Sequence, residues 1–292
     1  PHAWFPAAHS PAELVEPTVD NRMVGYPYTK RMVAVMDVDM AASVIVSSWE
    51  AADRLGVPAE RRVPLRGWAH ATDATYVAQH PDLSRSPAMS AVSAEALRVA
   101  GAGVDDIAHF DLYSCFASSV DFALDALGLE AGDPRGFTVT GGLPYCGGPA
   151  SNYMTHAIAE MVGRLRREPD ELGMVSGVGM HMTKHTFAVY GGDPTTAGDP
   201  RLGELQGGLD AANPERTISD TAEGEAVLAA YSVVHGRDGA AQWGLGILDL
   251  PDGSRCYGRA EAPELLAGWE ELECVGDGVT LPVDGAVNRI VA

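Results

Sequence analysis

The sequence predicts a layered α/β sheet protein followed by a small β-barrel. Up to residue 191, short β-type runs alternate with helical patterns, which is the order expected for helices packed on a sheet. The composition then shifts to Gly, Pro, Asp and Asn over 192–215, and short strand-like runs follow one another beyond it. We therefore expect an α/β domain over 1–191 that begins with a loop region over 1–35, a linker over 192–215 and an OB-like barrel over 216–292.

Four stretches of the α/β part carry apolar residues at the spacing of a helix that is buried on one face. A glycine directly follows each of the first three, and such a glycine favours the end of a helix. Ser86 and Pro87 are well suited to open the second helix, and Asn152 to cap the fourth. The predicted helices span 40–55, 86–100, 117–127 and 152–166.

Two groups of short runs between turn residues are predicted to be strands. Those of the α/β part span 62–71, 109–115, 172–179 and 184–190. Those after the linker span 226–235, 241–250, 254–260, 269–275 and 286–290. The Pro251-Asp252-Gly253 turn within the second group is a strong hairpin signal, so these strands favour a small antiparallel barrel.

Charge and cysteine content exclude several classes of protein. The net charge of −20 makes nucleic acid and anionic membranes poor partners. No apolar run reaches the roughly 20 residues of a membrane-spanning helix, so no membrane span is predicted. The four cysteines show no CxxC spacing, so neither a disulfide framework nor a metal site is indicated. A reducing cytoplasm is the simplest location for such a chain.

Three short motifs each follow a predicted strand, so their loops are expected to converge at one edge of the sheet. They are YSCF over 113–116, GGLPYCGGP over 141–149 and SGVGMH over 176–181. The two Gly-Gly pairs of the second motif permit unusual backbone conformations and the close approach of a ligand. The helix expected after this motif begins near Asn152, and a helix N-terminus attracts anions, although the glycines can equally serve close packing.

In order and spacing these motifs resemble the C-terminal half of the thiolase superfamily, in particular thiolase-like proteins related to the sterol-carrier-protein-linked thiolases. The resemblance covers about 1–191 and also includes YTKRMVAVMDVDMAAS over 28–43 and the residues TKH that follow the third motif. The tail is similar to the additional C-terminal domain that some of these proteins carry. Many such proteins are labelled acetyl-CoA acetyltransferases, which implies a role in lipid metabolism.

The resemblance implies that CoA or acyl-CoA is the ligand. It assigns the contacts with this ligand to five residues of the second motif, which are Gly141, Gly142, Gly147, Gly148 and Pro149. It also implies that an N-terminal thiolase half, in the same polypeptide or in a partner chain, completes the protein, and that homo- or hetero-oligomers form. The nucleophilic cysteine of thiolases lies in that other half.

The chain departs from the thiolase pattern at the catalytic positions of this half. The position where thiolases carry His or Asn is Tyr113, the His of their Gly-His-Pro motif corresponds to Gly148, and the second acid/base Cys corresponds to Gly177. A glycine has no titratable group, and such groups contribute roughly 10²–10⁴ to a rate. The usual carbon–carbon condensation is therefore not expected from these residues.

Other side chains near the motifs offer substitutes. Cys115 and Cys146 would be nucleophiles if their pKa values were lowered, although both also fit as small buried apolar residues. His181 would be a base, or a hydrogen-bonded structural histidine. For Tyr113, we expect the side chain to fill the space of the missing histidine, in preference to a role as proton donor. His156 favours a helix-surface or interface role, because it lies off the apolar stripe of its predicted helix.

Two functions follow from these observations. The first is an acyl-CoA-binding protein of the acyltransferase class with an altered active site, which the intact loop pattern favours. The second is a non-catalytic scaffold or regulatory subunit that binds protein partners, for example a hydratase-like or acyl-carrier subunit. The missing His and Cys favour this second function, and the sequence leaves open whether the protein is an enzyme.

Overall fold

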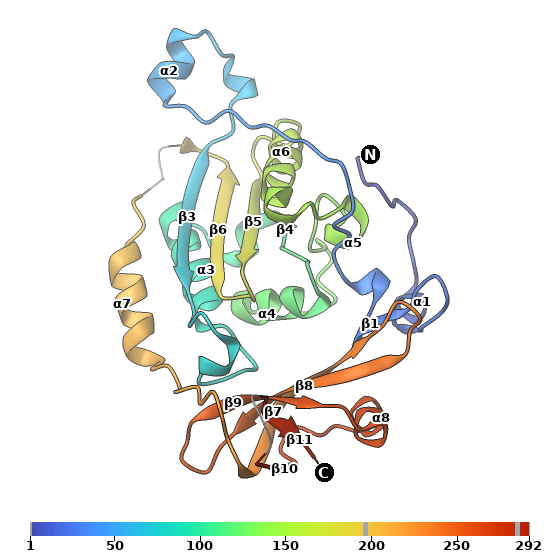
Figure 1. The fold of residues 1–292 in the computed structure, drawn as a ribbon. Coiled ribbons are helices and arrows are strands. Elements are labelled where there is room, and N and C mark those ends of the chain that lie inside the picture. Colours follow the sequence, from blue (N-terminus) through green and yellow to red (C-terminus); the bar gives the residue numbers. More distant parts are fainter. Residues whose placement is uncertain (1, 195–197, 284–286, 292) are drawn as a thin grey trace. The chain divides into compact units, whose positions relative to one another are not determined.

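Four strands form the central sheet of the first of two compact units, the α/β unit (Figure 1). The computed structural model describes residues 2–194, 198–283 and 287–291. The α/β unit contains the described residues of 1–7, 34–73 and 85–212, and the second, the β-sheet unit, contains those of 8–33, 74–84 and 213–292.

The sheet of the α/β unit has the strand order β3-β6-β5-β4. The strands are β3 (Leu65–Thr72), β6 (Lys184–Gly191), β5 (Leu172–Gly179) and β4 (Ile107–Asp111). Only β4 and β5 run parallel, and the other neighbours are antiparallel. The tight connection predicted between 179 and 184 makes β5 and β6 a hairpin, with Met180 and Met182 in the left-handed region of φ.

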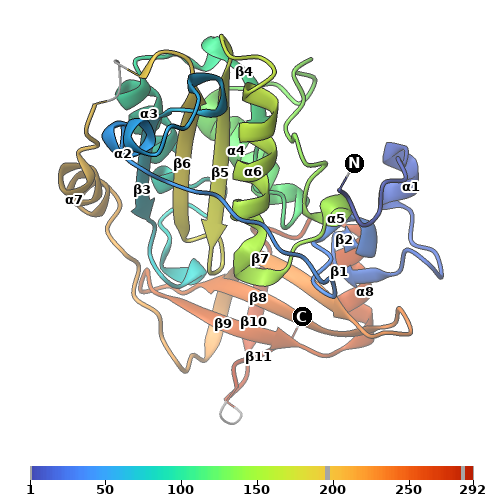
Figure 2. The same ribbon diagram turned by 90° about the horizontal axis from the view of Figure 1, so that it is seen from above.

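Helices cover both faces of this sheet, as Figure 2 shows. On one face, α3 (Pro87–Ala100) and α4 (Ala117–Leu127) enclose the larger apolar core with the strands, and α6 (Tyr153–Leu165) packs on the other face. Local signals define α3: the Ser86 hydroxyl accepts a hydrogen bond from the Met89 N–H, and Gly101 ends the helix with a φ of 63°.

Two glycines of β5 allow α6 to lie close to the sheet. A methyl group at Gly173 would overlap with the Sδ atom of Met161, and one at Gly177 would overlap with the Sδ atom of Met154. The two methionines lie seven residues apart, on one side of α6, and the two glycines lie four apart, on one face of β5. The thioether side chains therefore occupy space that any other residue at 173 or 177 would fill.

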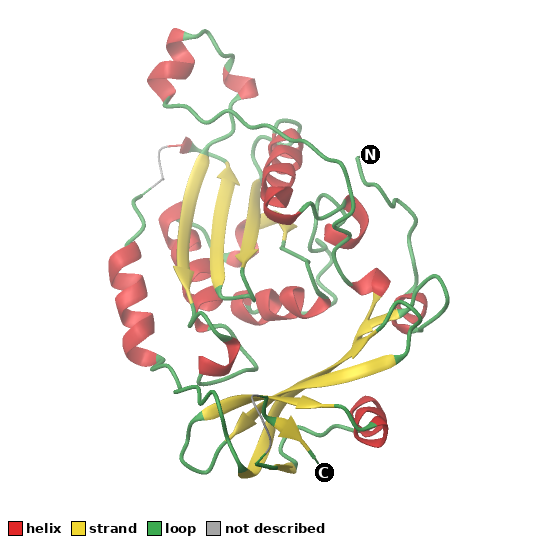
Figure 3. Cartoon of the chain, viewed as in Figure 1, coloured by secondary structure: helices red, strands yellow, loops and turns green. Residues whose placement is uncertain are grey.

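The β-sheet unit contains an open sheet of order β11-β9-β8-β7-β1-β2, with β10 also paired to β7 (Figure 3). Its elements are β1 (Met23–Gly25), β2 (Tyr28–Thr29), β7 (Gly224–His235), β8 (Ala241–Asp249), β9 (Arg255–Ala260), β10 (Gly278–Leu281), β11 (Arg289–Ile290), α1 (Pro11–Val15) and α8 (Pro263–Glu271). Trp269 and Leu266 of α8 are buried against Gly244 of β8. The described strands do not close, so the OB-like barrel is not confirmed.

Three sequence predictions for the C-terminal part need correction. The segment 269–275 is not a strand, because α8 runs to Glu271 and buries Trp269 in the core of the unit. The linker expected over 192–215 contains α7 (Leu202–Ala212), whose Leu202, Leu205 and Leu209 pack on the core of the α/β unit. The short strand β10 was missed, and residue 286 of the predicted last strand lies outside the described residues.

Two further corrections concern the first 55 residues. The expected loop region over 1–35 contains α1, β1 and β2. The helix predicted over 40–55 is reduced to α2 (Trp49–Arg54), which Ser48 caps through the Ala51 N–H. The residues before it have no regular secondary structure, and the Ile45 side chain is 97% exposed. A helix formed by these residues would have no surface against which to bury its apolar side chains. The β-branched residues among them do not favour a helix on their own.

No helix among the described residues is long and apolar enough to cross a membrane. The described residues also contain no group of three or more His, Cys, Asp or Glu side chains that could hold a metal ion.

Candidate functional site

Backbone and hydroxyl contacts bring the first two motifs together beside β5. The Ser114 hydroxyl accepts a hydrogen bond from the Leu143 N–H at 3.1 Å, and the Tyr113 N–H donates to the Ser176 hydroxyl at 2.9 Å. Ser176 lies within β5. His181 lies in the β5–β6 turn and is exposed, so the structure does not join this predicted base to the other motifs.

A buried carboxylate fixes the start of the glycine-rich motif. Asp111, at the end of β4, accepts hydrogen bonds from the N–H groups of Val139 and Thr140, both at 3.0 Å, and from the Tyr153 hydroxyl at 2.9 Å. Burial raises the pKa of Asp111 although these hydrogen bonds favour the charged form. This cluster connects β4, the loop and α6 at the base of the site.

A pocket of about 450 Å³ opens in the α/β unit above the end of this loop. Cys146 is the one predicted catalytic residue that lines it. The five residues predicted to contact CoA do not line it; they shape the loop beside it, where Gly141, Gly142 and Gly147 have φ values of 85–108°. The lining residues are His2, Trp4, Asp39, Met40, Ala41, Ala42, Ser43, Val139, Thr140, Cys146, His156, Ala159 and Glu160.

Sequence reasoning gave His156 a helix-surface or interface role and gave no role to Asp39 and Glu160, yet all three line the pocket. His156 and Glu160 lie four residues apart on α6 and therefore on one face of that helix, a spacing that could have signalled a shared role. Asp39 comes from the extended segment before α2, and no local pattern connects it with α6. The expected cap residue Asn152 makes no side-chain cap; its amide instead donates to the Met40 carbonyl at 3.3 Å.

Burial keeps the Cys146 thiol and the His156 imidazole of the pocket uncharged near pH 7. Burial, assisted by the negative charges of Asp111 and Glu160, raises the pKa of the Cys146 thiol. Burial also raises the pKa of Cys115, which does not line the pocket. Burial lowers the pKa of His156, so its imidazole stays uncharged. Neither thiol is therefore activated as a nucleophile by its surroundings.

Apolar side chains fill the space next to Gly148 and Gly177, the two glycines that the resemblance assigns to catalytic positions. A methyl group at Gly148 would lie 2.9 Å from Cδ2 of Leu143 and 3.0 Å from Cβ of Ala34, and Gly177 faces Met154 as described above. Tyr113 is half-buried and meets the ring of Tyr153 edge-on, with centroids 5.6 Å apart. Gly148 and Gly177 hold no acid or base, and the space beside them is filled.

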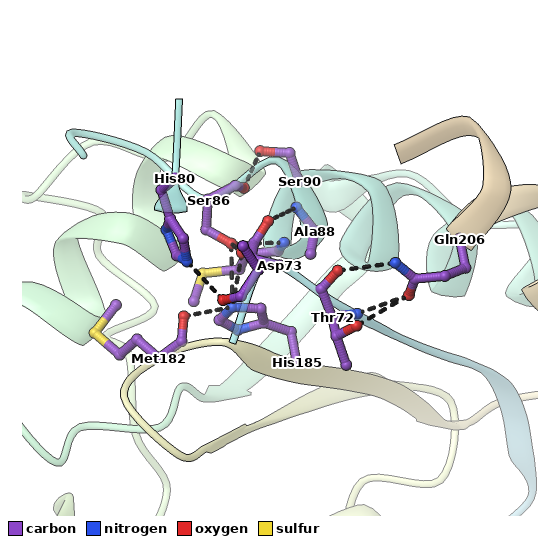
Figure 4. Close-up of polar contacts among 11 residues, drawn as sticks. Thr72, Asp73, His80, Ser86, Ala88, Ser90, Met182, His185 and Gln206 are labelled. Carbon is purple, nitrogen blue, oxygen red and sulfur yellow. Dashed lines mark hydrogen bonds and ion pairs between the residues drawn. The ribbon is translucent and has the colours of Figure 1, made fainter. Parts of the chain in front are cut away.

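A second polar cluster of the α/β unit combines Ser, His and Asp but does not have the geometry of a catalytic triad (Figure 4). Nε2 of His185 lies 3.1 Å from the Ser86 hydroxyl and 3.3 Å from Oδ2 of Asp73, while Nδ1 is buried without a partner among the described residues. A triad histidine uses its two nitrogens for the two partners separately. Ser86 also donates to Asp73 and caps α3, so the cluster anchors the start of that helix.

Comparison with known proteins indicates the class of the fold. No model of a protein family matches this sequence, and no curated protein matches it. The structure is similar to that of a monomeric SCP2-thiolase-like protein type 1 from Mycobacterium smegmatis, with a TM-score of 0.89 and 35% identity, covering 100% of this chain. The chain spans 63% of the length of that protein.

A second similar structure is human mitochondrial 3-ketoacyl-CoA thiolase, with a TM-score of 0.39, 16% identity and coverage of 50% of this chain and 34% of that protein. This likeness is too low to support an argument. The first comparison shows that the mixed α/β fold is thiolase-like, which confirms the sequence resemblance at the level of the fold.

Proposed function

We propose that this thiolase-like chain is part of an acyl-CoA-binding protein of the acyltransferase class whose usual acid and base residues are missing from this half. The observation that carries the proposal is the glycine-rich loop beside the pocket, where Gly141, Gly142 and Gly147 adopt positive φ values, while apolar side chains fill the space at Gly148 and Gly177. The similarity to the SCP2-thiolase-like protein supports the class of ligand.

The pocket is the proposed binding site for part of the ligand. Its volume lies in the range of small-molecule sites, about 300–1,000 Å³, and Val139, Thr140 and Cys146 of the glycine-rich motif line it. Asp39 and Glu160 also line it, and their charge repels phosphate. The uncharged acyl and pantetheine parts of acyl-CoA therefore fit this pocket better than its phosphates do.

An N-terminal thiolase half, in the same polypeptide or in a partner chain, would supply the nucleophilic cysteine. The similar protein is longer than this chain, which is consistent with such a second half. Within the described residues of this chain, the motif positions provide no replacement for the missing acid and base.

Calorimetry of the complete protein with CoA and acetyl-CoA tests the proposal. We expect saturable binding of both, weakened at least about tenfold by Ala159→Leu, which fills the pocket. Ala211→Leu, the same replacement at an exposed position of α7, is the matched control and should leave the affinity unchanged. The absence of binding up to millimolar concentrations would overturn the proposal.

A non-catalytic scaffold or regulatory subunit is the second candidate. The specific observation in its favour is that Leu143, Ala34 and Met154 pack where a working site needs free polar side chains. A thiolysis assay of the complete protein tests whether, contrary to both candidates, this half contributes catalytic residues. Activity that disappears on Cys146→Ala or Cys115→Ala would show that this half is catalytic after all and would exclude the scaffold.

A further inference from the structure

The pocket contains two carboxylates and no cationic side chain of Lys or Arg. Asp39 and Glu160 both line it, from the extended segment before α2 and from α6 respectively. Neither side chain has a hydrogen bond or ion pair with the described residues. Their charges are therefore not compensated by this part of the chain.

An aromatic ring and a thioether form an apolar surface of the same pocket. A methyl group at Gly147 would lie 2.6 Å from Sδ of Met40 and 3.4 Å from Cδ1 of Trp4, so both side chains rest on the backbone of this glycine. The backbone N–H of Trp4 donates to the Cys146 carbonyl at 3.4 Å and holds the segment that carries the ring against the loop. An indole face is the best aromatic partner for a cation.

A buried thiol also lines the pocket. Cys146 is only 4% exposed, lines the pocket, and its thiol has no hydrogen-bond partner among the described residues. The charge of Glu160 reaches this thiol, because it contributes to the raised pKa of Cys146. His156, whose pKa is lowered by burial, adds no positive charge near neutral pH.

We propose that this pocket binds a small organic ammonium compound. Uncompensated carboxylates attract the cation, while Trp4 and Met40 offer contact to an apolar chain that carries it. An anion of the same shape meets repulsion from Asp39 and Glu160. The inference does not require acyl-CoA binding, so the failure of either one leaves the other standing.

Three probes with one carbon skeleton test the charge preference: 3,3-dimethylbutylamine, 3,3-dimethylbutan-1-ol and 3,3-dimethylbutyrate. Each is added to the complete protein at pH 7 while iodoacetamide, a neutral reagent, alkylates Cys146, and peptide mass spectrometry measures the rate. The ammonium probe should slow this alkylation at a concentration at least about tenfold lower than the alcohol requires, and the carboxylate should not slow it. Cys115, which does not line the pocket, is the internal control and should react at one rate throughout.

Two neutralising substitutions test whether the charge preference comes from the pocket or from the general acidity of the protein. Glu160→Gln and Asp39→Asn should each reduce the preference for the ammonium probe over the alcohol several-fold. Asp121→Asn, on the surface of α4, should leave the preference unchanged. Equal protection by the amine and the alcohol, better protection by the carboxylate, or an unchanged preference in Glu160→Gln would each overturn the proposal.

Calorimetric titration of the three probes provides a second measurement that needs no access of a reagent to the buried thiol. Only the amine should bind, and Glu160→Gln should weaken it. If the amine shows no binding up to 100 mM, the proposal is wrong, whatever the alkylation rates are.

Discussion

The neighbours of a glycine decide whether a larger side chain would fit at its position. Gly177 has ordinary strand geometry and is still required, since Met154 occupies the volume of any side chain there. Gly163 of α6 is the opposite case, because a methyl group there meets only the tip of Arg167, at 3.9 Å. The same chemical change should therefore have opposite effects at these two glycines.

We expect Gly177→Ala to lower the free energy of unfolding by about 1–3 kcal/mol through overpacking. Gly163→Ala should raise it by about 0.5–1 kcal/mol, because alanine is the better helix former. Urea unfolding monitored by circular dichroism measures both. If packing is the cause, Gly177→Ala should lose less stability in the background of Met154→Ala, and an equal loss in both backgrounds would contradict this explanation.

A carboxylate on α3 gives the α/β unit a pH dependence. The bidentate hydrogen bonds of Arg98 lower the pKa of Glu95 from 4.5 to about 2, and Glu95 also accepts the Arg201 N–H at 2.8 Å, next to the start of α7. A carboxyl group with a depressed pKa stabilises the fold fully above its unfolded value, and this contribution is lost as the pH falls towards the folded value.

Glu95→Gln should therefore destabilise the protein at pH 7, and the difference from the unaltered protein should shrink from pH 5 to pH 3. Urea titrations over this range measure the difference. A difference that stays constant with pH would assign the effect to packing and not to charge.

At the scale of elements, the sequence predicted the helices whose ends are marked by local residues. Ser86-Pro87 and Gly101 bound α3, and Gly128 ends α4, so both helices appear where they were expected. Helix α7 was missed because its glycines suggest a linker, while its leucines gain their stability only from a core that the sequence does not display. The pocket was missed for a related reason, since Asp39 and Glu160 meet only in the folded chain.

Helix α7 also protects one end of the edge strand β3. The Gln206 side chain accepts the Thr72 N–H at 2.9 Å and donates to the Thr72 carbonyl at 3.0 Å, in the manner of a neighbouring strand (Figure 4). Gln206→Ala should increase the hydrogen-exchange rate of the Thr72 amide about tenfold or more, since a hydrogen bond of about 1–1.5 kcal/mol is lost. The amide of Ala69 inside β3 should be unaffected, and equal acceleration at both would indicate general loosening of the strand.

At the scale of the whole molecule, the β-sheet unit is assembled from three separate parts of the chain. Arg255, which is 4% exposed, joins two of them: its guanidinium donates to the His80 carbonyl at 2.6 Å and pairs with Asp249 at 2.7 Å. The segment 74–84 therefore forms part of the packed structure of this unit.

A fragment of residues 213–292 should consequently fail to fold on its own. It deprives Arg255 of the His80 carbonyl, and a hydrogen bond to a charged group contributes about 1.5–3 kcal/mol. It also lacks Tyr26, which packs against the core of the unit. Circular dichroism and urea unfolding of the fragment would show no cooperative transition. A sharp transition like that of the complete protein would demonstrate that the segments 8–33 and 74–84 are dispensable.

The filled spaces beside Gly148 and Gly177 also limit the mutational routes open to this chain. A histidine at 148 collides with Leu143, and a cysteine at 177 collides with Met154, so each needs a second change before it is tolerated. Restoring both side chains takes at least four coordinated substitutions, and the intermediates lose stability without gaining chemistry. The loss of acid and base residues that we propose for this half is therefore far easier to enter than to reverse.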